Sequence, residues 1–322
     1  MNRLSFGILE FGNRHNDQSS MHTILDVLDF AEAAERLGFS RFWLTEHHVY
    51  NPLIGWASPR VLLPLILRQT ERINVGTAGV LMNFHSPYRV ALDFRLLANL
   101  FPGRCDLGFA NGRPSQNIGQ QLRCEQFSRY PDDFEHRVNR VARLFSEEEA
   151  ILRKEQTIIP PAFGAIPDLY ALGSSFRRYE WAISNRMNMV KSAFHSLDSL
   201  DFEEYDIIAR YRDEFAKTHG YLPQVVMALA GSCVPNEATG KRVHQEMLKI
   251  NQGRAIVNSI VAPPEEFQER IWSIARRYGV SEFVIREVGQ HSEQQLESIG
   301  LISESFGLLS SKPAERITVN NY

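Results

Sequence analysis

The sequence predicts an α/β fold, a single-domain (β/α)8 barrel of the TIM type with insertions in its βα loops. Eight short apolar segments alternate with segments of helical periodicity, and no composition break marks a linker. Regular alternation of this kind builds a parallel sheet with right-handed crossovers, and eight units close into a barrel. The length of 322 residues suits one such barrel. An open doubly wound sheet is the alternative, but neither G-x-G-x-x-G after the first strand nor G-x-x-x-x-G-K-[ST] occurs.

The strands are predicted from short apolar runs, which lie at 4–9, 41–45, 73–81, 105–110, 169–172, 189–193, 224–230 and 281–286. The helices are predicted from apolar residues at helical spacing. They lie at 24–37, after Ser58-Pro59, at 90–101, 134–145, 176–185 and 205–215, within 235–261, and at 263–278 and 296–306. Gly38 and Gly279 end two of these helices, because glycine accepts the left-handed conformation there. A polar stretch, 111–131, precedes the helix at 134, and a turn is predicted at Gly253. The barrel is assigned to residues 1–309 and a polar, frayed tail to 310–322.

Composition excludes several classes of protein. The chain is 43% hydrophobic and 23% charged, with a formal net charge of -3. It therefore lacks the excess of positive charge that is typical of proteins that bind nucleic acid or an anionic membrane. The longest apolar run, 61–67, is too short to span a bilayer. The amino terminus goes directly into a strand-like run, so we do not expect a signal peptide there. Cys105, Cys124 and Cys233 are far apart and read as reduced thiols without metal spacing. We expect a cytoplasmic protein without a metal.

Glu46, His47 and His48 follow an apolar strand directly and are the strongest candidates for chemistry. In a barrel the carboxyl ends of the strands carry the active site. Consecutive residues of an extended segment point to opposite faces, so the two imidazoles are not expected to bind one metal together. One imidazole is expected to act in acid/base chemistry, against the alternative of a buried structural histidine. The spacing alone does not decide which of the two it is.

Small residues end the third predicted strand, at 76–79, where Ala78 and Gly79 would let a flat ring lie close to the backbone. Small residues that only fit the taper of the barrel are an equal alternative.

Two loops carry candidate donors for an anion. Gly173, Ser174, Ser175 and Arg177 follow the fifth strand, where a helix amino terminus and a guanidinium suit a phosphate. Asn111 and Arg113 follow the neighbouring fourth strand and could serve the same anion. The alternative is a serine helix cap beside solvated arginines. Together the loops indicate a cofactor that bears a phosphate.

The chain resembles the bacterial luciferase-like family of flavin-dependent monooxygenases. The likeness extends to about residue 302, and its motifs lie at 37–48 (LGFSRFWLTEHH), 75–81 (VGTAGVL), 85–91 (HSPYRVA), 100–108 (LFPGRCDLG), 263–267 (PPEEF) and 278–283 (YGVSEF). No single motif is specific, but the set is.

This resemblance implies an enzyme that uses reduced FMN and dioxygen to oxygenate a small organic substrate, with secondary metabolism as a candidate setting. His47 would assist chemistry at the flavin C4a position with Glu46 beside it. The Ala78–Gly79 bond, which is often cis in the family, would lie under the isoalloxazine ring. A separate flavin reductase is the expected transient partner. A homodimer through the helices near 58–69 and 88–100 is also implied.

The chain departs from the luciferase pattern at the phosphate loops. Asn111 stands where the pattern has arginine, with Arg113 two residues later, and Arg177 stands at a threonine-like position. Ala110 occupies the position of the reactive cysteine. Two other functions therefore stay open, a deazaflavin-dependent dehydrogenase on the same fold and a non-catalytic flavin-binding protein.

Overall fold

The computed structural model describes residues 3–12, 19–48, 55–114, 116–122, 133–195, 203–250 and 256–310. The turn predicted at Gly253 and Cys124 lie outside these residues, as does the predicted tail from residue 311 onward. The division of the chain at residue 309 stays a prediction. Cys105 and Cys233 are buried free thiols.

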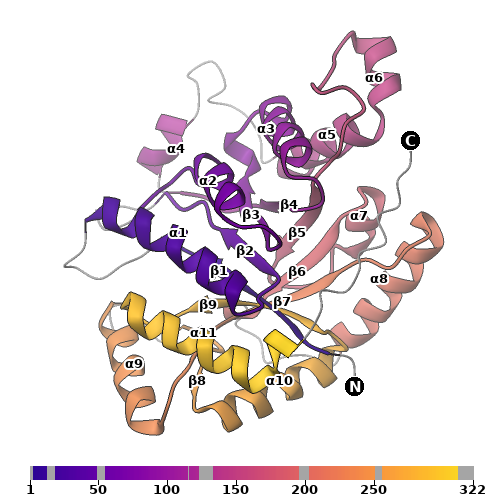
Figure 1. The fold of residues 1–322 in the computed structure, drawn as a ribbon. Helices are drawn as coiled ribbons and strands as arrows, with labels where there is room; N and C mark the ends of the chain where they lie inside the picture. Colours follow the sequence, from indigo (N-terminus) through magenta and orange to yellow (C-terminus); the bar gives the residue numbers. More distant parts are fainter. Residues whose placement is uncertain are drawn as a thin grey trace.

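Eight parallel strands form a closed barrel, which confirms the predicted fold (Figure 1). The strands are β1 (Ser5–Glu10), β2 (Arg41–Leu44), β3 (Asn74–Leu81), β4 (Cys105–Ala110), β5 (Asp168–Gly173), β6 (Asn188–Ser192), β7 (Val225–Cys233) and β9 (Glu282–Glu287). Strand β9 pairs with β1 through Phe6 and Phe283 and with β7 through Met227 and Phe283, which closes the ring.

A further short strand, β8 (Ile260–Ala262), pairs with the end of β7 outside this ring. The sequence pattern does not predict β8, because three residues are too few to show a period. The pairing needs a glycine at position 231, where an added Cβ would lie 2.3 Å from the carbonyl oxygen of Ile260.

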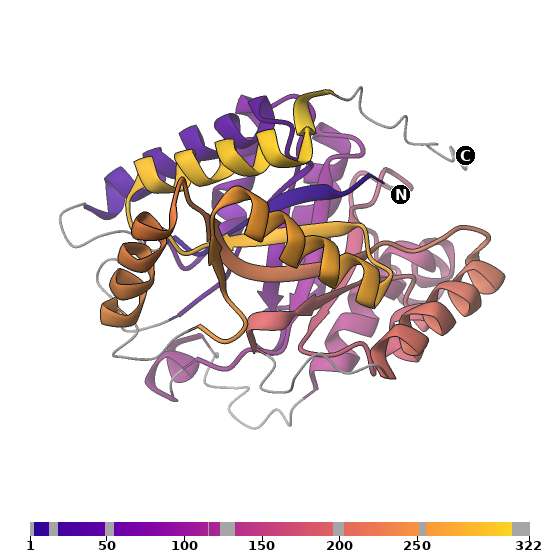
Figure 2. The same cartoon turned by 90° about the horizontal axis from the view of Figure 1, so that it is seen from below.

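Helices lie around the outside of the barrel, and α1 and α11 lie side by side (Figures 1 and 2). The helices are α1 (Ser20–Arg36), α2 (Leu63–Gln69), α3 (Pro87–Leu100), α4 (Gln116–Leu122), α5 (Phe134–Ser146), α6 (Glu148–Glu155), α7 (Tyr179–Ser184), α8 (Glu203–His219), α9 (Glu237–Ile250), α10 (Pro264–Tyr278) and α11 (Ser292–Phe306). Short 3-10 turns are η1 (Pro59–Val61), η2 (Met82–Phe84), η4 (Ala193–His195) and η5 (Leu308–Ser310). Among the described helices, none has the length and apolar character needed to cross a membrane.

Local chemistry explains the helix boundaries. The Ser19 side chain accepts a hydrogen bond from the backbone N–H of His22 at the start of α1, and Gly279 ends α10 at φ 61°. The predicted helix at 176–185 is shorter than expected: α7 begins at Tyr179, because residues 174–178 form bends and a turn. Helices α4 and α6 were not predicted, since each is short and mostly polar.

Hydrophobic side chains form two layers, one between the strands and the helices and one inside the barrel. The inner layer includes Trp43, Tyr170, Val226 and Val284. At the carboxyl ends of the strands, the half-buried side chains of Phe11, Ala78 and Leu172 form the edge of this layer, here called its upper edge.

The amino end of the barrel is closed by a buried polar network around Arg41. Its Nη1 donates to Asp106 Oδ2 at 2.6 Å, and its other nitrogens donate to Glu282 and Gln224. Trp43 Nε1 also donates to Asp106 Oδ2, at 2.8 Å. Such a network ties four strands of the barrel together at the end opposite to the loops that carry activity in this fold.

Candidate functional site

His47 lies at the carboxyl end of the barrel on the side that faces its interior. Side chains alternate along an extended segment, so Trp43, Thr45 and His47 share one face, and Trp43 belongs to the inner layer. The His47 ring stacks on Phe11, with ring centroids 4.9 Å apart and planes 25° apart. Because Phe11 packs against the inner layer, His47 is placed at the mouth of the barrel.

Glu46, its neighbour, is buried and joins the ends of β2 and β3. One carboxylate oxygen accepts the backbone N–H of Leu81 at 3.0 Å. The other lies 2.6 Å from His85 Nε2 and 2.9 Å from His48 Nε2. Burial alone would raise the pKa of Glu46, but these hydrogen bonds outweigh it, so the pKa lies below its ordinary value. Glu46 is therefore an ionised anchor, and His48 is one of its partners.

The surroundings of His47 keep its imidazole uncharged at neutral pH. Burial lowers the pKa of His47 to about 4, and the positive charge of Arg286 adds to this effect. An uncharged imidazole can accept a proton or a hydrogen bond from a bound molecule. The structure thus separates the two histidines that the sequence left open: His48 contacts a carboxylate, whereas His47 faces the barrel interior.

A group of residues that the sequence analysis missed surrounds His47. The guanidinium of Arg286 lies over the ring of Phe11 at 4.1 Å and over that of Phe194 at 5.6 Å. Phe194 in turn contacts the ring of His195, with centroids 4.5 Å apart. These residues follow or end β1, β6 and β9, so the strand-end rule that singled out Glu46 also applies to them.

Ala78 and Gly79 lie on β3, next to the strand that carries His47. The peptide bond between them is cis, as the family resemblance implied. Ala78 is half-buried at the upper edge of the inner layer. An added Cβ at Gly79 would lie 2.6 Å from the carbonyl oxygen of Gly108, so glycine is needed here for close strand packing.

The two predicted anion loops follow neighbouring strands. Phe109 of β4 pairs with Ala171 of β5, so both loops begin at the same side of the barrel mouth. Asn111 Oδ1 accepts from Asn83 Nδ2 at 2.8 Å, and Arg113 is exposed. Gly173, Ser174 and Arg177 are also exposed, with Ser175 half-buried. Arg178 is at the N-cap position of α7 and makes no side-chain cap hydrogen bond, so the alternative of a serine cap is wrong. The helix begins only at Tyr179, so the predicted helix amino terminus does not lie directly at Ser174 and Ser175.

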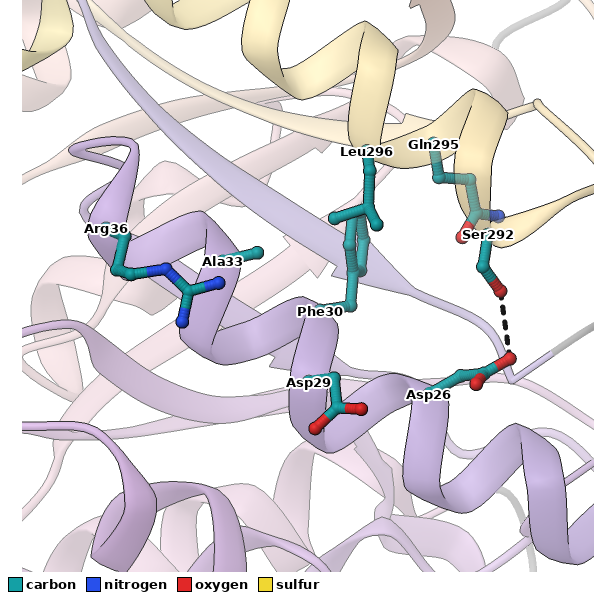
Figure 3. Close-up of a pocket in the computed structure, with 8 residues that line it drawn as sticks. All are labelled: Asp26, Asp29, Phe30, Ala33, Arg36, Ser292, Gln295 and Leu296. Atoms are coloured by element: carbon teal, nitrogen blue, oxygen red, sulfur yellow. Dashed lines mark hydrogen bonds between the residues drawn. The ribbon is translucent and has the colours of Figure 1, made fainter.

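A cavity of about 180 Å³ lies away from this mouth, between α1 and α11 (Figure 3). Asp26 and Asp29 line it from α1, and Ser292 donates a hydrogen bond to Asp26 at 2.8 Å. Because it lies between two outer helices, it is separate from the candidate site. A smaller cavity of about 70 Å³ lies beside the mouth and is lined by Phe11, Arg286 and Glu287 among others. Among the described residues no cluster of histidine, cysteine or acidic groups could hold a metal ion.

The family model of luciferase-like monooxygenases matches residues 4–200. The chain belongs to this family. It is 25% identical to YwcH, an uncharacterized protein of Bacillus subtilis (strain 168), over 94% of this chain and 99% of the relative. It is 24% identical to a luciferase-like monooxygenase of Escherichia coli (strain K12), over 87% and 82% of the two chains. Membership confirms the predicted enzyme class, a flavin-dependent monooxygenase.

Solved structures share the fold. Apo-MsnO8 has a TM-score of 0.78 at 21% identity and covers 95% of this chain and 99% of its own. The oxygenating constituent of 3,6-diketocamphane monooxygenase from Pseudomonas putida, in complex with FMN, has a TM-score of 0.71 at 15% identity over 94% and 97%. An F420-dependent secondary alcohol dehydrogenase has a TM-score of 0.62 at 12% identity over 96% and 100%. The fold thus occurs with more than one redox cofactor.

Proposed function

We propose that this protein is an FMN-dependent monooxygenase that takes reduced FMN from a separate reductase and uses dioxygen to oxygenate a small organic substrate. One observation carries the proposal: an uncharged imidazole, His47, faces the interior at the mouth of a luciferase-like barrel. Reduced FMN, when bound, supplies the electrons that activate dioxygen.

The described residues fit a flat, polar-edged ring at this mouth. The upper edge of the inner layer offers apolar contact through Phe11, Ala78 and Leu172. The Thr45 hydroxyl, on the same face as His47, is buried and has no hydrogen-bond partner among the residues that the structure describes. A buried hydroxyl without a partner is costly, so a ring nitrogen or carbonyl that pairs with it would be favoured.

We assign the phosphate to the loops after β4 and β5. Asn111 and Arg113 would approach it from one loop, and Gly173, Ser174, Ser175 and Arg177 from the other. Backbone N–H groups, hydroxyls and guanidinium forks are the donors that phosphate binds best. The ring would then extend from these loops across Ala78 and Gly79 toward His47. A homodimer and a transient reductase remain part of the proposal.

In this arrangement the protein would position the reactants, exclude water from them and supply one group that can hold a proton. His47 would hold or accept a proton at the reacting centre, and Glu46 would hold the end of β2 in place through Leu81. Phe11 and Phe194 would exclude water beside the imidazole.

The test is anaerobic reconstitution with reduced FMN or with a reduced deazaflavin, followed by labelled dioxygen and a panel of small organic substrates. We expect FMN binding and incorporation of one labelled oxygen atom into a product, measured by mass spectrometry. His47→Ala should lower product formation by about 10²- to 10⁴-fold and leave FMN binding near wild type, because it removes the acid/base group alone. His244→Ala, an exposed histidine on α9, is the matched control.

Three outcomes would contradict the proposal. Binding and anaerobic turnover with the deazaflavin alone would assign a dehydrogenase. Flavin binding without oxygen incorporation from any substrate would assign a flavin-binding protein. Equal product yields from His47→Ala and wild type would remove His47 from the reaction.

A further inference from the structure

Arg286 is a cation at the barrel mouth that the proposed oxygenation does not use. It lies on β9, half-buried, with its guanidinium over Phe11 and Phe194. Within the described part of the chain no carboxylate makes an ion pair with it, and no hydrogen bond from it is found. Aromatic faces stabilise a guanidinium, but they leave its five N–H donors unused.

The nearest acids are engaged elsewhere. Burial lowers the pKa of Arg286 to about 10, and the charge of Glu10 only partly opposes this effect. One oxygen of Glu10 accepts the Gly12 N–H at 2.7 Å. Glu287 accepts hydrogen bonds from Ser232 and Ser298, each at 2.6 Å. Burial raises the pKa of Glu287 to about 8, so this carboxyl is mostly protonated at neutral pH. Arg286 therefore retains its charge for a bound molecule.

The position of Arg286 separates it from the proposed phosphate loops. In the closed barrel β9 lies four strands from β4 in either direction, so Arg286 is across the mouth from Asn111 and Arg113. It lies instead on the side of the mouth that carries Phe11, whose ring also stacks with His47. After burial, the charge of Arg286 is the next largest cause of the low pKa of His47. A small cavity of about 70 Å³ adjoins it, lined by Phe11 and Val288 among others. An anion that reaches Arg286 would lie on the same side of the mouth as His47 and against apolar side chains.

We propose that Arg286 is a specificity-determining residue that binds the carboxylate of a small organic acid, which is the substrate class of this site. The carboxylate would accept paired N–H donors from the guanidinium, and the apolar body of the acid would contact Phe11 and Phe194. This inference rests on the proposed function only for calling the acid a substrate. Its test measures binding and needs neither flavin nor oxygen.

The experiment uses isothermal titration calorimetry on the full chain without flavin. The probes are phenylacetate and octanoate, each compared with its uncharged amide. We expect wild type to bind each acid about 10- to 100-fold more tightly than its amide, as one charge-assisted pair provides. Arg286→Gln should reduce this preference to about twofold or less, because it removes the charge. Arg286→Lys should give an intermediate value, since an ammonium cannot pair through two parallel N–H bonds.

Arg153→Gln, on the exposed face of α6, is the matched control and should keep the wild-type preference. Circular dichroism checks folding, and if Arg286→Gln does not fold, Arg286→Lys carries the test. No saturable acid binding, equal binding of acid and amide by wild type, or an unchanged preference in a folded Arg286 variant would each overturn the proposal. FMN binding to the Arg286 variants should stay near wild type. If the Arg286 variants lost FMN binding and wild type bound acid and amide equally, Arg286 would instead be a contact of the flavin ring.

Discussion

Arg41 at one end of the barrel and Arg286 at the other have opposite kinds of surroundings. At the amino end Arg41 contacts Asp106, Glu282 and Gln224, so each charge has a partner. At the carboxyl end His47 and Arg286 contact aromatic rings instead. A fully paired network leaves no donor for a ligand, whereas ring contacts hold a polar group in place and leave its donors or acceptors available.

The pKa values follow the same division. Burial would lower the pKa of Arg41, but Asp106 and Glu282 outweigh it and raise the pKa well above its ordinary value. At the mouth, burial lowers the pKa of His47 and raises that of Glu287. Ion pairs thus keep Arg41 charged at the amino end, whereas burial keeps His47 and Glu287 uncharged at the mouth. We expect stability to depend most on the first end, and its pH dependence, together with function, on the second.

The largest effect on stability is expected from Asp106→Ala. This substitution removes a carboxylate partner of the buried Arg41 and the hydrogen-bond acceptor of Trp43. The loss should lower the free energy of unfolding by about 3–5 kcal/mol. Urea denaturation measures this loss, and FMN binding by the folded fraction should be retained. Asp213→Ala, in a surface pair with Lys217, should stay near wild type. Equal stabilities of the two variants would remove the contrast between the barrel ends.

An intermediate effect is expected from Glu287→Gln, and it should depend on pH. In the folded protein Glu287 holds its proton up to about pH 8, whereas the unfolded group has its ordinary pKa of 4.5. Its contribution to wild-type stability is therefore full below about pH 4.5 and is lost as the pH rises toward 8. Glutamine does not ionise, so the variant does not lose this contribution. Its free energy of unfolding relative to that of wild type should therefore rise by on the order of 1–3 kcal/mol between pH 5 and pH 8.

Urea denaturation at pH 5 and pH 8 tests this. The titration of His47, which acts between about pH 4 and 6.5 with the opposite sign, is common to both proteins and cancels. Glu149→Gln on the surface of α6 is the control and should follow the wild-type pH profile. A constant difference between Glu287→Gln and wild type would show that Glu287 is ionised throughout.

The smallest effect is expected from Ser174→Ala. Its hydroxyl is exposed on the loop after β5, so stability should not change. FMN affinity should fall by about tenfold, the value of one hydrogen bond to a charged group. Fluorescence titration measures the affinity, and Ser184→Ala in α7 is the control. An unchanged affinity would place the phosphate elsewhere.

Much of the fold was predictable because it depends on repetition. The alternation of apolar strands and amphipathic helices predicted all eight barrel strands and the closed barrel. It failed where an element has no pattern of its own. Strand β8 has three residues, and α4 contains one aliphatic residue before Leu122. The start of α7 was misplaced, because a glycine followed by serines can form turns as readily as a helix start.

The candidate site was predictable only in part. Residues next to each other in sequence, such as Glu46 and His47, carry a visible signal. The group around Arg286 combines the ends of β1, β6 and β9, and no spacing in the chain connects these segments. Applying the strand-end rule to every strand would have identified Arg286 and His195. The rule could not have shown that Arg286 lacks an acidic partner among the described residues, because that depends on three-dimensional packing.

The carboxylate of Glu46 has a consequence for how this enzyme could diversify. It joins the end of β2, next to His47, to the backbone of β3 through Leu81, so two adjacent strands hold this part of the mouth. Replacement of the segment that follows β7, the strand opposite to β3 in the barrel, would leave that contact and both proposed phosphate loops intact. Exchange of that one segment could therefore change which substrates are accepted while the surroundings of His47 on β2 and β3 stay the same.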